Sequence, residues 1–95
     1  MVNMSIDRFI TDDFRVLAYL YDKQAPDGKA YVTQQEIADH LELNRATINK
    51  IIGELKSEEY IQQDGTHNGR YILNHKAVQI VTAFNNLNKN YNKEM

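Results

Sequence analysis

The strongest constraint on the fold lies in segment 34–58, where two short helical patterns are separated by only a few residues. Thr33 and Glu36 have the spacing of a capping box, which predicts a helix over 34–41. A second helix is predicted over 44–58, with an asparagine, a good N-cap residue, at its start. Its apolar residues share one arc of the helical wheel and are expected to face the core: Ile48, Ile51, Ile52 and Leu55.

The turn between these two helices is framed by one small residue and several apolar ones. Ala38 is small enough to let the helices cross closely, and Ile48 and Ile51 follow it by ten and thirteen positions. In this spacing, segment 35–55 resembles a helix-turn-helix unit, whose second helix enters the major groove of DNA. Glu42 stands where such units often have glycine. Because a positive φ at a glutamate costs about 1 kcal/mol, we expect a wider turn here.

Further helices and short strands are predicted on both sides of this unit. In chain order they are a helix over 12–21, a strand over 30–32 after the turn Pro26–Gly28, strands over 60–63 and 70–73, and a helix over 75–91. The first helix is capped by Thr11. Its expected buried stripe consists of residues at helical spacing: Phe14, Leu17, Ala18 and Tyr21.

The complete order, from Phe14 to about Asn90, resembles that of winged-helix regulators of the MarR and ArsR type. The resemblance implies a mainly α fold with a small β-hairpin wing, the winged helix-turn-helix. The length of 95 residues predicts a single domain over 1–95. Residues 1–11 would be an N-terminal arm. Segment 60–73 would be the wing, and the third helix the DNA reader.

The face of the third helix opposite its apolar arc supplies candidate DNA-binding residues. Arginine and lysine suit guanine edges or phosphates, asparagine suits adenine, and small residues allow a close approach to the groove. Arg70 is expected to contact a phosphate or the minor groove from the base of the hairpin. The full candidate set is Asn44, Arg45, Ala46, Thr47, Asn49, Lys50, Gly53, His67 and Arg70. For any single member, an ordinary solvent-exposed role is the alternative.

The last predicted helix has more apolar residues than so small a body can cover. Three of them are expected to pack on the chain's own core: Ala77, Ile80 and Val81. The others extend beyond it and are the expected homodimer interface: Phe84, Leu87 and Tyr91. The alternative interface is the N-terminal arm, with Ile6, Phe9 and Ile10. A dimer also suits recognition of palindromic DNA.

Composition narrows the classes of protein further. The chain has no cysteine, its three histidines lack metal-ligand spacing, and no phosphate loop or nucleophile elbow is found. No apolar run is long enough for a membrane span. We therefore expect a cytoplasmic protein that is not an enzyme and uses no metal or cofactor. The net charge of −2 is unusual for a DNA-binding protein, but basic residues outnumber acidic ones between Asn44 and Lys76.

Three functions fit these expectations. The first is a repressor or autoregulator that binds specific double-stranded DNA as a homodimer. The second is a centromere-binding adaptor for plasmid or phage DNA segregation, acting with a filament-forming partner protein; small TubR-type adaptors are similar in length and in the helix after the wing. The third is a winged helix used only to bind other proteins, which the acidic charge balance favours.

Overall fold

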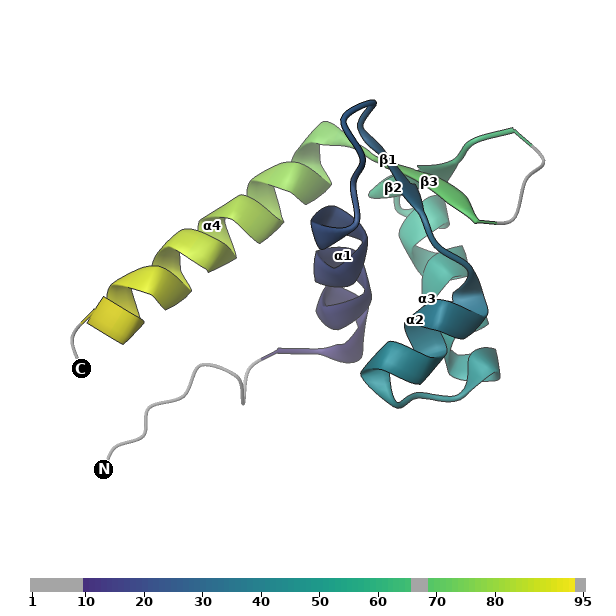
Figure 1. The fold of residues 1–95 in the computed structure, drawn as a ribbon, viewed down its shortest axis with the longest axis horizontal. Helices are drawn as coiled ribbons and strands as arrows, with labels where there is room; N and C mark the ends of the chain where they lie inside the picture. The colour runs from purple at the N-terminus through teal and green to yellow at the C-terminus, as the bar shows by residue number, and fades with distance from the viewer. Residues whose placement is uncertain (1–9, 66–68, 94–95) are drawn as a thin grey trace.

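The computed structural model describes the backbone of residues 10–65 and 69–93 and side chains up to Lys89. The helices are α1 (Asp12–Asp22), α2 (Gln34–Leu41), α3 (Arg45–Ser57) and α4 (His75–Lys93), and the strands are β1 (Lys29–Tyr31), β2 (Ile61–Gln63) and β3 (Arg70–Leu73). In Figure 1, α1, α2, α3 and the small sheet form one body, and α4 runs away from it. The element order is that of the predicted winged helix-turn-helix fold.

Helix α1 lies at the centre of this body, in contact with α2, α3, α4 and β3. It begins after Thr11, whose hydroxyl accepts a hydrogen bond from the Phe14 amide at 3.2 Å, as its capping role predicts. The buried face of α1 is rotated about the helix axis relative to the predicted stripe, which was therefore wrong. The buried residues are Val16, Leu17 and Leu20. Three residues of the predicted stripe are only partly buried: Phe14, Ala18 and Tyr21. Neighbours on several sides of α1 place compact aliphatic side chains innermost and the larger rings at the flanks.

The three strands form an antiparallel sheet in the order β1-β3-β2. Tyr71 of β3 is fully buried in the core and pairs with Ala30 on one side and Gln63 on the other. The first strand begins one residue earlier than predicted. The hairpin between β2 and β3 is closed by a hydrogen bond of 2.8 Å from the Asp64 amide to the Arg70 carbonyl.

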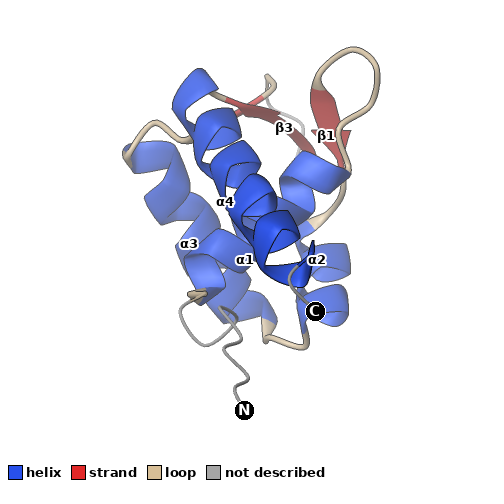
Figure 2. Ribbon diagram, turned by 90° about the vertical axis from the view of Figure 1, so that its left-hand side faces the viewer, coloured by secondary structure: helices blue, strands red, loops and turns tan. Residues whose placement is uncertain are grey.

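Helix α4 joins the body through its first turns. Ala77 and Val81 are fully buried, as predicted, whereas Ile80 is 40% exposed, so its predicted place in the core was wrong. Phe84 is partly buried against Phe14, with ring centroids 4.8 Å apart. Figure 2 shows α4 crossing in front of α1, with α3 on one side and α2 on the other. Helices α1 and α4 are thus in contact, and the Phe14–Phe84 pair is part of that contact.

The turn between α2 and α3 is tight, so the expected wider turn was wrong. Glu42 adopts the left-handed conformation at φ 60° and ψ 42°, and α3 starts after the N-cap Asn44. The Leu43 amide donates to the Ala38 carbonyl at 3.0 Å, which closes the end of α2. Arg15 of α1 donates to the Leu41 carbonyl at 3.0 Å. These bonds satisfy two carbonyls at the helix end and offset the strain at Glu42.

Glu42→Gly should raise the free energy of unfolding by about 0.5–1 kcal/mol, because glycine adopts a positive φ without steric cost. Chemical denaturation measures this difference. The matched control is Glu58→Gly at the end of α3, where φ is −91° and glycine should destabilise. A lower stability for Glu42→Gly would contradict the left-handed turn.

Candidate nucleic-acid interface

Helix α3 has two faces of opposite character. Its inner face is formed by the predicted aliphatic residues, all of them buried: Ile48, Ile51, Ile52 and Leu55. Five residues of the predicted DNA-binding set lie exposed on the rest of its surface: Arg45, Ala46, Asn49, Lys50 and Gly53. Because the inner face is fixed in the core, the outer residues are held on a helix that cannot rotate freely. A groove-binding helix needs this arrangement.

The first turn of α3 is organised by its N-cap. The Asn44 carboxamide oxygen accepts a hydrogen bond from the Thr47 amide at 2.8 Å. Thr47 itself is half-buried. Both predicted site residues thus contribute to the N-cap of α3. The Asn44 side-chain oxygen already accepts a hydrogen bond from Thr47. Arg45, which follows the cap, is exposed.

Two glutamines at the start of α2 contact the outer face of α3, and they were not predicted from the sequence. Asn49 Nδ2 donates to Gln34 Oε1 at 3.2 Å, and Arg45 Nη1 donates to Gln35 Oε1 at 3.5 Å. Gln35 Nε2 also donates to Asp39 Oδ1 at 2.8 Å. These two bonds show that the start of α2 lies beside the outer face of α3. The close crossing of the two helices, which was predicted from Ala38, was the available signal.

Gly53 interrupts the interior of α3 on its exposed side. A Cβ built at this position would meet nothing within 4 Å, so no neighbour within the described chain requires a glycine there. Glycine destabilises a helix interior by about 1 kcal/mol relative to alanine. The missing side chain does, however, leave room for a close approach from outside. This is the property for which Gly53 was predicted as a contact.

The base of the wing contains a small group of charged and aromatic residues. Arg70 lies with its guanidinium 5.9 Å from the Tyr31 ring centroid and with Nη1 3.9 Å from Asp64 Oδ2. Lys29 of β1 reaches the same carboxylate oxygen at 3.1 Å. Of these residues, only Arg70 was singled out from the sequence. His67, the other predicted wing residue, lies outside the described residues.

A turn aspartate extends this group. The Tyr31 hydroxyl donates to Asp27 Oδ2, and the Lys29 amide donates to Asp27 Oδ1 at 2.9 Å. The hydrogen bond from Tyr31 lowers the pKa of the Asp27 carboxyl, and the same bond raises the pKa of the Tyr31 hydroxyl. Asp27 is therefore ionised at neutral pH and holds Tyr31 in place beside Arg70.

The predicted dimer residues on α4 are in different situations. Leu87 is 48% exposed, whereas Phe84 stacks on Phe14 of its own chain. The Tyr91 side chain lies outside the described part of the structure, as do Ile6 and Phe9 of the alternative interface. Ile10 is half-buried and lines a shallow apolar depression of about 240 Å³ beside Phe14 and Phe84.

The described residues contain no group of three or more histidine, cysteine, aspartate or glutamate side chains arranged to hold a metal ion. No helix within the same ranges is both long and apolar enough to cross a lipid bilayer.

Comparison with known proteins identifies the fold. Residues 14–79 match the family model of the Crp-like helix-turn-helix domain. Among solved structures, MepR of Staphylococcus aureus, a transcription regulator of the multidrug efflux pump MepA, is similar with a TM-score of 0.70 and 24% identity, covering 94% of this chain and 65% of that chain. No curated protein sequence matches the chain.

Two other MepR structures from the same organism are similar to this chain to the same degree. The MepR–DNA complex has a TM-score of 0.66 at 24% identity over 94% of this chain and 65% of that chain. A single-residue MepR mutant has a TM-score of 0.68 at 24% identity over 94% and 66%. The chain spans 65–66% of the length of these structures. The winged helix-turn-helix fold predicted from the sequence is confirmed.

Proposed function

Because this chain belongs to the family of Crp-like helix-turn-helix domains, we propose that it binds double-stranded DNA as a transcription regulator. In this proposal α3 lies in the major groove, and the β2–β3 hairpin contacts the neighbouring backbone or minor groove. The observation that supports it most is the polar outer face of α3, held by a fully buried inner face. Further support comes from MepR, a transcription regulator of similar fold whose structure has been solved with DNA.

Each residue of the outer face has a specific part in this proposal. Arg45 and Lys50 supply positive charge for phosphates or guanine edges, and Asn49 supplies an amide for adenine. Gln34 accepts from one hydrogen of Asn49 Nδ2, which leaves the Asn49 oxygen and a second hydrogen for a base. Gly53 allows the middle of the helix to approach the groove.

The chemistry of this face favours DNA over a protein partner. Protein interfaces are centred on large apolar or aromatic side chains. In the described residues, the exposed large apolar side chains are Tyr31, Ile80 and Leu87, and none belongs to α3. The outer face of α3 offers hydrogen-bond donors and positive charge instead, which suits the edges of bases and the phosphates beside them.

We further propose that two copies associate through α4. Ile80 and Leu87 are exposed on this helix, which projects past the body in Figure 1. Covering them with a second copy would remove apolar surface from water. A two-fold dimer would place two α3 helices to read the halves of a palindrome.

The regulator is preferred to the segregation adaptor with a filament-forming partner because MepR, a solved protein of similar fold, is a transcription regulator. Footprinting on the DNA that flanks the chain's own gene distinguishes the two. One palindromic site supports the regulator, and an array of repeated sites supports the adaptor.

Arg45→Ala and Lys50→Ala should each weaken binding to the footprinted site by about 1–3 kcal/mol, because each removes a charged contact from the groove. Fluorescence anisotropy measures the affinity, and thermal unfolding should be unchanged because both side chains are exposed. Lys23→Ala, at the far end of α1, removes the same charge as a control. Full affinity in both α3 variants would exclude α3 as the reading helix.

Leu87→Asp should shift the protein toward monomer in sedimentation velocity while leaving the fold intact, because the residue is half exposed within its own chain. Asn86→Asp adds the same charge at the adjacent, exposed position and should stay dimeric. Phe84 is left unchanged, because replacing it would also remove its contact with Phe14 and could unfold the chain as well as dissociate the dimer. A dimeric Leu87→Asp variant would place the interface elsewhere.

A further inference from the structure

At the base of the wing, two positively charged side chains converge on one carboxylate oxygen. Lys29 Nζ lies 3.1 Å and Arg70 Nη1 3.9 Å from the same atom, Asp64 Oδ2. Lys29 comes from β1 and Arg70 from β3, and Asp64 directly follows β2. The sheet therefore brings Lys29, which is distant in sequence, to the two sides of the β2–β3 hairpin. In this geometry two cations surround a single anionic oxygen.

The backbone and its neighbours fix this geometry. Arg70 pairs with Tyr31 across β1 and β3, and the Asp64 amide is bonded to the Arg70 carbonyl at 2.8 Å. The Tyr31 ring lies against the Arg70 guanidinium, and its hydroxyl is held by Asp27. Asp27 also accepts from the Lys29 amide, so one turn aspartate positions both Lys29 and the ring beside Arg70.

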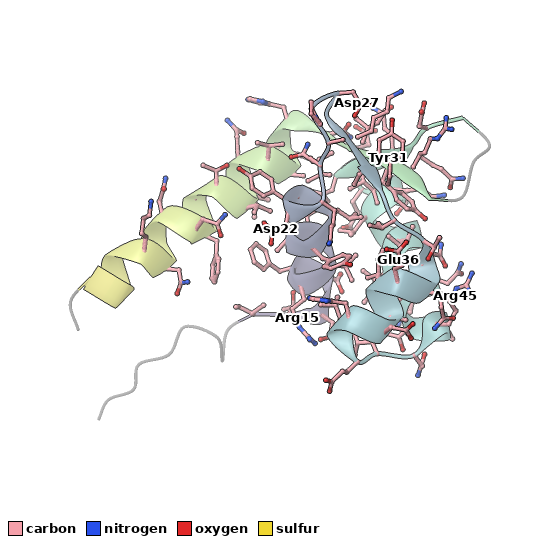
Figure 3. All side chains as sticks on the ribbon, in the orientation of Figure 1. Arg15, Asp22, Asp27, Tyr31, Glu36 and Arg45 are labelled. Carbon is pink, nitrogen blue, oxygen red and sulfur yellow. The ribbon has the colours of Figure 1, made fainter. Side chains whose placement is uncertain are left out.

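This group lies on the side of the molecule that contains the outer face of α3. Figure 3 shows Tyr31 beside the hairpin and Arg45 at the start of α3, both on the side away from α4. A duplex that lay along α3 in the major groove would have its phosphate backbone on this same side of the molecule. A backbone phosphate would then be an anionic partner available to the two cations.

We propose that Lys29 and Arg70 form a binding site for one DNA backbone phosphate, and that Asp64 occupies this site in the free protein as an internal competitor. The inference rests on the proposed DNA-binding function. A phosphate oxygen presents the two cations with the same negative charge as the carboxylate. Because a phosphate can bind here only when an existing ion pair is broken, the net stabilisation from binding it is small.

The presence of Asp64 at this site therefore lowers the affinity for DNA of any sequence. Binding without sequence preference depends almost entirely on cation–phosphate contacts. A carboxylate that shields two cations reduces this binding, whereas the base contacts of α3 are unaffected. Asp64 therefore acts as a specificity-determining residue, because it makes the binding of the protein to a DNA site depend on the base contacts of α3.

The ionisation of Lys29 agrees with this arrangement. The hydrogen bond to Asp64 raises the pKa of the Lys29 ammonium, and the charge of Asp64 acts in the same direction. Lys29 is thus fully charged at neutral pH and available to a phosphate that displaces Asp64.

The test is Asp64→Asn, measured by anisotropy on a random-sequence duplex over a series of KCl concentrations. The amide keeps the size of the carboxylate and can still accept from Lys29, but removes the competing charge. We expect tighter binding than in the wild type and a salt slope steeper by about 0.9, the value for one neutralised phosphate. This difference in slope corresponds to roughly eightfold in affinity between 1 M and 0.1 M salt.

Two further variants make the result specific. Asp22→Asn changes the net charge equally at the end of α1, away from the wing, and should give a much smaller increase in affinity. In the Asp64→Asn background, Lys29→Met should take back part of the gain in affinity and in salt slope, because only Arg70 is then left to bind the phosphate. Circular dichroism should be unchanged in all variants.

Three results would overturn the inference. Asp64→Asn could bind the random duplex no more tightly than Asp22→Asn, or Asp64→Asn could bind it more weakly than the wild type. The third such result is that Lys29→Met leaves affinity and salt slope unchanged in the double variant. The second would mean that Asp64 organises the wing rather than competing with DNA. Absence of salt-dependent duplex binding by the wild type and by Asp64→Asn alike is a different outcome. It would overturn the proposed function itself.

Discussion

The burial of one face of α3 is the contact on which the rest of the structure depends. Each fully buried aliphatic side chain contributes roughly 1.5–3 kcal/mol, and α3 buries four of them: Ile48, Ile51, Ile52 and Leu55. This packing fixes the rotation of α3, so the direction of Arg45 and Lys50 follows from residues that are buried in the core. The close crossing with α2, made possible by the buried Ala38, then sets Gln34 and Gln35 beside the outer face.

Electrostatics has a more local part. The net charge of −2 offers no general attraction to DNA, so binding must depend on where the positive groups lie. In the wing, Lys29 and Arg70 are brought together by strand pairing but share the carboxylate of Asp64. On α3, by contrast, Lys50 is exposed. A protein built this way would derive its affinity mainly from the reading helix and less from the backbone contacts of its wing.

Local signals predicted the elements well, and distant contacts explain the errors. The capping box at Thr33 and the N-cap at Asn44 depend on residues three positions apart, so the starts of α2 and α3 were predicted correctly. The rotation of α1 and the exposure of Ile80 depend on which helices surround them, and a single helical wheel lacks that information. At Glu42 the expected penalty for a positive φ did not prevent a tight turn, because hydrogen bonds from Leu43 and Arg15 hold the helix end together.

The same distinction applies to the candidate site. The outer face of α3 follows from its inner face and was predicted, whereas the Lys29–Asp64 contact needs the strand order β1-β3-β2. Amide NMR of the labelled protein titrated with a duplex carrying its footprinted site tests the central claim most directly. We expect saturable shifts concentrated in segments 45–53 and 29–31 and at Arg70. Shifts concentrated on α1 or α4, or none that saturate, would contradict it.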